Sequence, residues 1–167
     1  MKKRITIYKI TFLLILCILA TSCLTQKEKE TNRSQVNEMI KNNRFKFEAQ
    51  QANPLRPDII SANLRNLNGN YSLSLSKDTL KCYLPYFGVA RSAPYNSTDN
   101  GLNFTSTDFS YDKVEKSKGA YEITIIPNDT DKANKLYFTI SENGSASLNV
   151  TSNNRDPISF TGNILKN

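Results

Sequence analysis

The side chains that most often perform catalysis are scarce in this sequence of 167 residues. It contains no histidine, which removes the commonest general base, the commonest zinc ligand and every triad that depends on an imidazole. Its six glycines are scattered singly, so there is no glycine-rich phosphate loop. Carboxylates are abundant, but no spacing selects a pair suited to glycoside hydrolysis. We therefore expect no catalytic residue, no cofactor and no metal site, with a carboxylate-based hydrolase as a remote alternative.

Two short patterns carry residue types that could react or bind metal. Cys82 stands between Leu80 and Leu84 in an alternating apolar row, which predicts a buried, inert thiol and not a nucleophile. Asn128–Asp131 (NDTD) has the composition of the start of a calcium loop, but the glycine and the closing glutamate of such a loop are missing. We interpret this tetrapeptide as a surface turn.

Cys23 is the residue for which the sequence predicts a definite modification. Four cations precede the apolar run Ile10–Ala20, and the small residues Thr21 and Ser22 lead into Cys23. This order is typical of a secretory signal, and the run is shorter than the roughly 20 residues that span a bilayer. The pattern resembles a bacterial lipoprotein signal, in which Cys23 is acylated and becomes the first mature residue.

The alternative is an ordinary signal peptide or an uncleaved anchor in which Cys23 is incidental. Cys17 is a poor rival, because Leu16 before it is too bulky for the cleavage position. Stable anchoring needs more than one acyl chain, which a diacylated or triacylated cysteine provides. We therefore expect a membrane partner, reached through acyl chains on Cys23.

The predicted processing defines three parts of the chain. Residues 1–22 are the signal peptide, residues 23–33 are a polar, flexible tether, and residues 34–167 are one domain. We expect the domain in the cell envelope, most simply at the outer membrane. Glu28 and Glu30 loosely resemble a surface-export signal, and a merely solvated linker explains them equally well, so the side of the membrane stays open.

Removal of the signal changes the charge balance of the protein. The full chain has a net charge of +7, but four of its 22 cations and none of its 15 anions precede Cys23, which leaves 18 against 15, or +3. This is not the charge of a nucleic-acid-binding protein. Once Cys23 is acylated only Cys82 remains, so an intrachain disulfide is excluded and the core alone must stabilise the fold.

Hydrophobic periodicity predicts one short helix followed by strands. Ser34 offers an N-cap, and Val36, Met39 and Ile40 follow at helical spacing. From residue 44 the apolar residues alternate with polar ones, as in half-buried strands, and we interpret residues 54–68 as a loop. The alternating sets are Phe45/Phe47/Ala49, Tyr71/Leu73/Leu75, Leu80/Cys82/Leu84, Leu102/Phe104, Phe109/Tyr111, Tyr121/Ile123/Ile125, Leu136/Phe138/Ile140, Ala146/Leu148/Val150 and Ile158/Phe160.

These patterns place the chain in the mainly β class. We expect eight or nine antiparallel strands behind the short N-terminal helix, arranged as an up-and-down barrel or as a two-sheet sandwich. Residues 76–78 predict a tight turn, and Asn143-Gly144 predicts a type I′ hairpin turn. Periodicity alone does not separate a barrel from a sandwich.

One connection is unusually aromatic. Pro85 cannot donate to a strand ladder, so pairing should stop there, yet the following stretch keeps large rings where a loop is normally polar. The first interpretation is that these rings plug the core, with tyrosine hydroxyls bonded to backbone. The second is the rim of a binding cleft, made of Tyr83, Tyr86, Phe87, Arg91 and Tyr95.

The strings DTLKCYLPYFGVARSAPY, FKFEAQQANP and SENGSASLNVTSNNRDPISFTG resemble the Bacteroidetes lipoprotein family known as domain of unknown function 4251. The resemblance covers essentially the whole mature chain and implies an anchored envelope protein with no established activity and no catalytic residues. Asp78-Thr79-Leu80 is also similar to the acceptor pattern for protein O-glycosylation in those bacteria. Thr79 is therefore a candidate glycosylation site, although it also suits a position beside a hairpin turn.

Two functions follow from these observations. The first is a non-enzymatic, lipid-anchored envelope module that binds a small molecule, a glycan or a protein through residues 85–95 and the adjacent barrel mouth. The second is a structural or assembly lipoprotein of an envelope complex with no ligand. The two differ in what the structure should contain: a cavity lined by Tyr and Phe for the first, a solid core with an exposed apolar patch for the second.

Overall fold

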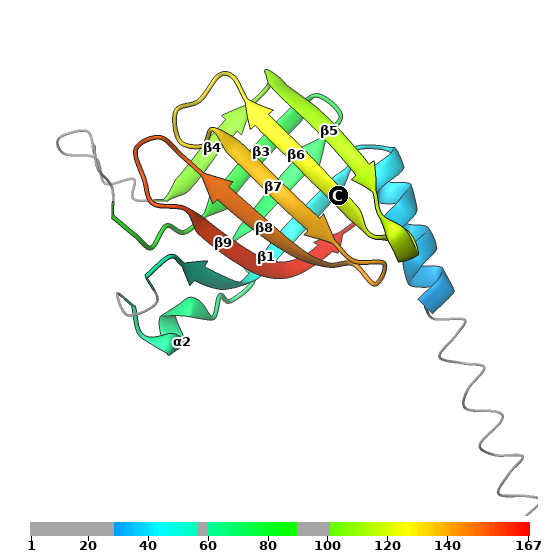
Figure 1. Ribbon diagram of the computed structural model, residues 1–167, viewed down its shortest axis with the longest axis horizontal. Helices are drawn as coiled ribbons and strands as arrows, with labels where there is room; N and C mark the ends of the chain where they lie inside the picture. The colour runs from blue at the N-terminus through cyan, green and yellow to red at the C-terminus, as the bar shows by residue number, and fades with distance from the viewer. Residues whose placement is uncertain (1–28, 57–59, 90–100) are drawn as a thin grey trace, which may run out of the picture.

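The computed structural model of the protein describes residues 29–56, 60–89 and 101–167 (Figure 1). A helix covers residues 29–41, and nine strands follow. The strands are β1 (Phe45–Pro54), β2 (Ser72–Ser76), β3 (Thr79–Leu84), β4 (Leu102–Ser106), β5 (Phe109–Glu115), β6 (Tyr121–Pro127), β7 (Lys135–Ile140), β8 (Ser145–Thr151) and β9 (Ile158–Leu165). Two short helical segments, α2 (Ala62–Arg65) and η2 (Ser117–Gly119), complete the elements.

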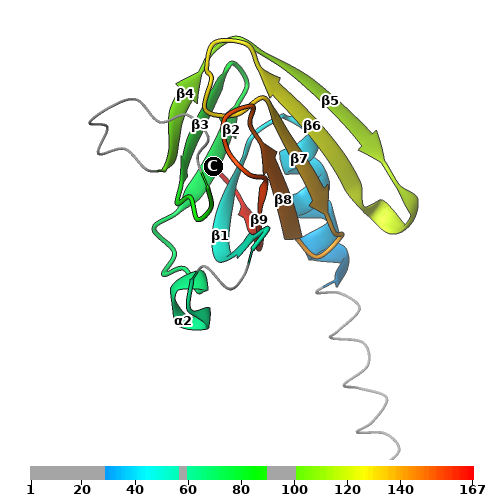
Figure 2. The ribbon, with the colours of Figure 1, turned by 60° about the vertical axis from the view of Figure 1, so that its left-hand side comes forward.

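The nine strands form one antiparallel sheet in the order β4-β3-β2-β1-β9-β8-β7-β6-β5. The order follows the chain except where β1 pairs with β9, and this pairing of the first strand with the last curls the sheet into a nearly closed barrel (Figure 2). The two edges are β4 and β5, which are consecutive in the sequence. The prediction of an eight- or nine-stranded β domain is confirmed, and of the two architectures it is the barrel that forms.

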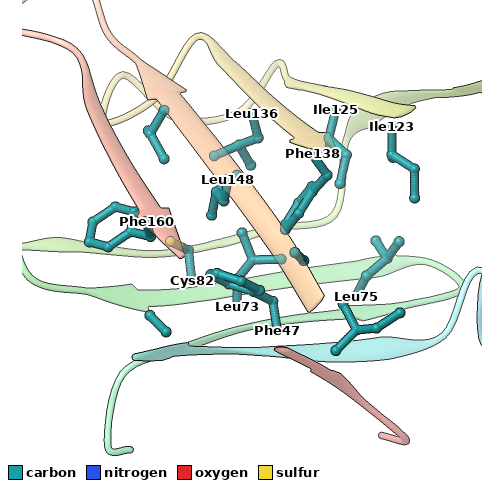
Figure 3. Packing of buried hydrophobic residues seen from close by; sticks show 14 of the residues in the cluster. Phe47, Leu73, Leu75, Cys82, Ile123, Ile125, Leu136, Phe138, Leu148 and Phe160 are labelled. Carbon is teal, nitrogen blue, oxygen red and sulfur yellow. The ribbon is translucent and has the colours of Figure 1, made fainter. Parts of the chain in front are cut away.

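Apolar side chains from both sides of the barrel fill its interior (Figure 3). The rings of Phe45 and Phe47 from β1 meet Phe138 from β7 edge-on, with centroids 5.6 and 5.5 Å apart. Leu73, Leu148, Phe160 and their neighbours are fully buried around them. The interior is thus a packed core of the kind that alternating strand residues produce.

A β-bulge in β1 changes which residues of this long strand point into the barrel. The register with β9 shifts between Ala49 and Gln51, and Gln50 and Gln51 are both exposed, so burial passes from odd positions to even ones. Gly162 lies opposite Ala49, and a β-carbon there would overlap the carbonyl oxygen of Glu48. The absence of a side chain at residue 162 is what lets the two backbones approach at the bulge.

The N-terminal helix packs against the barrel through Val36 and Ile40, which are buried in the core. The carbonyl oxygen of Ile40 accepts a hydrogen bond from Nζ of Lys113 on β5 at 3.1 Å, and the Tyr121 hydroxyl donates to Oδ1 of Asn37 at 3.0 Å. No helix within residues 29–56, 60–89 and 101–167 is long and apolar enough to cross a bilayer.

Three local predictions are wrong. The helix already includes residues 29–33, so Ser34 lies inside it and does not cap it. The region 54–68, predicted as a loop, contains α2. In the β7–β8 turn only Gly144 has a positive φ, of 89°, and its N–H donates to Ser141 O, so the turn is not type I′, which needs positive φ at two residues.

Candidate functional site

The candidate site lies at the end of β3, where the predicted aromatic connection begins. Tyr83 is the penultimate residue of β3 and keeps 53% of its surface exposed. Tyr86 and Phe87 follow Pro85 and are both half-buried against the core. The three described rings of the predicted set therefore differ: Tyr83 is exposed on the barrel wall, whereas Tyr86 and Phe87 pack partly against the core.

Two consecutive residues of the β8–β9 connection hold both flanks of residues 90–100. The N–H of Asp156 donates to the carbonyl oxygen of Val89 at 3.2 Å. Nη1 of Arg155 donates to the carbonyl oxygen of Gly101 at 3.1 Å. Nη2 of Arg56, beyond the end of β1, forms an ion pair with Asp156 at 3.1 Å. We call Arg155 and Asp156 the clamp.

Tyr86 joins this clamp through both its ring and its hydroxyl. The hydroxyl lies 3.1 Å from the carbonyl oxygens of Val89 and of Asp156, so it can donate to either. The guanidinium of Arg155 lies 4.9 Å from the ring centroid, within the range of a cation–π contact. Burial, followed by the nearby Asp156 carboxylate, raises the pKa of Tyr86 above its ordinary value, which keeps the hydroxyl a donor.

These contacts match the structural interpretation of Tyr86, in which the hydroxyl bonds to backbone. Gly88 fits the same arrangement, since a β-carbon there would lie 2.5 Å from the Tyr86 hydroxyl oxygen. A role of Tyr86 or Phe87 in ligand binding stays a prediction.

Tyr83 stacks on Tyr71, the residue before β2. The ring centroids are 5.6 Å apart and the ring planes differ by 18°. Tyr71 is half-buried against the core, so it backs one face of the Tyr83 ring while Tyr83 remains half exposed. The cross-strand neighbours of Tyr83 are Ser72 on β2 and Asn103 on β4.

Four other predicted site residues are not part of this arrangement as the structure describes it. Arg91, Tyr95 and Cys23 are outside the described residues. Thr79 is the first residue of β3, directly after the two-residue turn that joins it to β2, and it is half-buried. Its position beside a hairpin turn is confirmed, and its glycosylation stays a prediction.

The remaining residues that could react or bind metal have structural roles. Cys82 is buried on the inner face of β3, as predicted, and burial raises the pKa of its thiol far above the ordinary value.

In the predicted surface turn, Oδ2 of Asp129 accepts hydrogen bonds from the N–H groups of Thr107 and Asp108 at 2.8 and 3.2 Å. Hydrogen bonds to its carboxylate lower the pKa of Asp129, and the bond from the Ser106 side chain has the largest effect. Within the ranges that the structure describes, no group of three His, Cys, Asp or Glu residues is placed to hold a metal ion.

Sequence reasoning missed the clamp and the role of Tyr71. Arg155 and Asp156 lie in a polar turn that carries no hydrophobic pattern, and only the tertiary fold brings them to β3. Tyr71 continues the inward row of Leu73 and Leu75, and this periodicity predicts a ring in the core. The ring does pack partly against the core, but it also stacks on Tyr83, which the pattern does not predict. The one available signal for Tyr83 was its place in the outward row of an amphipathic strand.

Comparison with known proteins gives a family and a fold. The sequence model of the family described as "Domain of unknown function (DUF4251)" matches residues 27–164. A search of curated proteins found no match. The crystal structure of a DUF4251 family protein from Bacteroides eggerthii is similar at a TM-score of 0.55 and 13% sequence identity, with 81% of this chain and 88% of that chain covered. At this identity the likeness shows the fold alone.

Proposed function

The chain belongs to the DUF4251 family, and we propose that it is a lipid-anchored, non-enzymatic module of the bacterial cell envelope that binds a partner on its outer surface. The observation that carries the binding proposal is the clamp. Arg155 and Asp156 donate hydrogen bonds to the carbonyl oxygens of Gly101 and Val89, which ties both described ends of the β3–β4 connection to the barrel. Connections that begin and end on a folded scaffold commonly carry binding residues.

The interior is a packed core and not the cavity lined by Tyr and Phe that we expected of a binding module, so the proposal places the site on the surface. Phe45, Phe47 and Phe138 meet at the centre of the barrel, in the space that a ligand-binding barrel keeps for its ligand. The absence of histidine from the sequence supports a non-enzymatic role. The anchor is supported by the order of basic, apolar and small residues before Cys23.

One observation favours the alternative, a structural or assembly lipoprotein without a ligand. A groove of about 330 Å³ lies between the N-terminal helix and β9, and its lining is half apolar (Met39, Ile164, Leu165) and half polar (Gln35, Glu38, Lys166). Together with a filled barrel, a groove that joins an apolar floor to charged residues suits a neighbouring protein of an envelope complex.

Fatty-acid labelling tests the anchor. Cells expressing the full-length protein are fed an alkyne-tagged fatty acid, and the label on the purified protein is measured for the wild type, Cys23→Ser and Cys17→Ser. Cys17→Ser is the matched control, because it changes the other cysteine of the same segment. We expect label on the wild type and on Cys17→Ser but none on Cys23→Ser. Equal labelling of all three, or of none, contradicts the proposal.

Photo-crosslinking in cells separates the two functions. A photoreactive amino acid replaces Val89 beside the clamp, Leu165 in the groove, or Val114 on β5, whose exposed fractions are nearly equal at 43%, 45% and 44%. We expect crosslinked products from position 89 that are missing at 114. Products from position 165 alone favour the assembly role.

A further inference from the structure

The outer wall formed by β2, β3 and β4 carries a chemically distinctive row of side chains. Figure 2 shows these strands together on one side of the barrel. Strand pairing aligns Asn103 of β4, Tyr83 of β3, Ser72 of β2 and Glu48 of β1 in one row across the sheet. At a strand spacing of about 4.8 Å, four residues in such a row span roughly 14 Å.

The only large apolar group in this row is the Tyr83 ring. Its neighbours in the row offer an amide, a hydroxyl and a carboxylate, which are groups that form hydrogen bonds. In the next row, Ser74 faces Lys81 across β2 and β3, and Lys81 faces Thr105. Lys46 of β1 completes this second row opposite Ser74, and its Nζ lies 3.9 Å from the Glu48 carboxylate. The two rows therefore combine one aromatic ring with hydroxyl, amide and charged groups.

The stacking of Tyr71 prepares the Tyr83 ring for contact. Tyr71 lies nearly parallel at 5.6 Å and supports one ring face, while Tyr83 remains 53% exposed. A supported ring loses little conformational freedom when a ligand covers its other face, because its orientation is already fixed. The exposed ring face is flat and apolar, and the residues paired with Tyr83 on the two neighbouring strands, Ser72 and Asn103, are polar.

This chemistry fits a sugar better than a protein. A pyranose ring with equatorial substituents has an apolar face of C–H groups, which packs on an aromatic face, and a rim of hydroxyls that bond to amides, hydroxyls and carboxylates. A protein interface has a desolvated core of several apolar or aromatic anchors, and the two rows supply only one. We propose that Tyr83, backed by Tyr71 and flanked by Asn103 and Ser72, is a carbohydrate-binding platform for β-1,4-linked pyranose chains.

The proposal deepens the proposed function, on which it rests, by naming a ligand class and a surface on β2, β3 and β4. Such a chain can come from the amino-sugar glycan of the bacterial wall or from an external glucan. The two sources share the same ring geometry and differ in the acetamido group. Chitohexaose and cellohexaose serve as probes for the two.

The test is isothermal titration of the full-length mature protein, in detergent micelles, with each hexasaccharide. We expect binding of at least one; chitohexaose alone indicates wall glycan, cellohexaose alone an external glucan, and both indicate recognition of the shared ring face. Tyr83→Ala should weaken binding by about tenfold or more, and Tyr83→Phe should retain it. Tyr137→Ala, on β7, is the aromatic control and should bind as the wild type does.

The melting temperature of Tyr83→Ala should stay close to that of the wild type, because the side chain is half exposed. Absence of binding to both hexasaccharides, or unchanged binding by Tyr83→Ala, overturns the platform. If fatty-acid labelling at Cys23 is intact in that case, the platform fails and the anchored module stands. Loss of labelling with intact sugar binding overturns the anchor and leaves the platform.

Discussion

The guanidinium of Arg155 lies 4.9 Å from the centroid of the Tyr86 ring. The two residues are far apart in the sequence, and their contact joins the β3–β4 connection to the β8–β9 connection. The Tyr86 hydroxyl strengthens the same junction, because it can donate to the backbone carbonyl of Val89 on one side or of Asp156 on the other. A cation–π contact at a partly exposed site contributes about 0.5–1 kcal/mol, so ring and hydroxyl have comparable weight here.

Removal of the Tyr86 hydroxyl should destabilise the protein while leaving the ring contact in place. Tyr86→Phe is expected to lower the free energy of unfolding by about 1 kcal/mol, because the hydroxyl donates to a carbonyl in a half-buried position. Urea denaturation followed by far-ultraviolet circular dichroism measures this change. Tyr83→Phe is the matched control and should shift the unfolding free energy by less than about 0.5 kcal/mol. Equal effects of the two substitutions would contradict the assigned role of Tyr86.

A side chain at Gly162 should disrupt the bulge between β1 and β9. In Gly162→Ala the new methyl group overlaps the Glu48 carbonyl oxygen, which belongs to the backbone and cannot rotate away. We expect a loss of about 1–3 kcal/mol in the free energy of unfolding. Thr161, the exposed neighbour of Gly162, provides the control: Thr161→Ala should lower the free energy of unfolding much less. A Gly162→Ala protein as stable as the wild type would show that the two strands can separate freely at the bulge.

Tyr111 predicts a pH dependence of stability in the alkaline range. Burial raises its pKa from the ordinary 10.0 to about 12. Between these two values the unfolded chain releases the phenolic proton while the folded chain retains it, so the free energy of unfolding falls as the pH rises. Below pH 10 the residue adds no slope. Tyr111→Phe should remove this part of the fall in the free energy of unfolding. The measurement is urea denaturation of the wild type and of Tyr111→Phe over a series of pH values, compared at each pH.

The Tyr111 hydroxyl also has no hydrogen-bond partner within the described part of the chain. Its removal should therefore raise the free energy of unfolding at neutral pH by up to about 1 kcal/mol. A clear destabilisation in Tyr111→Phe at neutral pH would mean that the hydroxyl does form a bond.

Cys82 should be unreactive in the folded protein. Its thiol is buried on β3 between apolar neighbours, and burial raises its pKa, so almost no thiolate is present near pH 8. Alkylation followed by peptide mass mapping should leave Cys82 unmodified in native buffer and modify it fully in concentrated urea. Rapid alkylation in native buffer would show that β3 opens readily.

The residues that carry periodicity account for what the sequence predicts correctly. Phe45, Phe47 and the later alternating sets give the nine strands, because a strand that buries one face must place an apolar residue at every second position. The inward position of Cys82 follows from the same rule. The sequence could not locate the opening of the barrel between β4 and β5, because the pairing of β1 with β9 depends on how the whole sheet curls.

The candidate site was predictable only in part, for a related reason. Tyr83 could be assigned to the outer face from its place in β3. Arg155 and Asp156 meet Val89 and Gly101 only because the β8–β9 and β3–β4 connections emerge near each other, and no local pattern encodes this. The start of the helix was placed too late because residues 29–33 are polar and exposed, and a polar first turn has no apolar stripe to reveal it.

The central claim, an anchored envelope module, is tested most directly by the mass of the N-terminal peptide of the protein purified from its native membrane. We predict that this peptide begins at Cys23 and carries the added mass of two or three acyl chains. A peptide that begins upstream of Cys23, or an N-terminal Cys23 without fatty acid, would contradict the account.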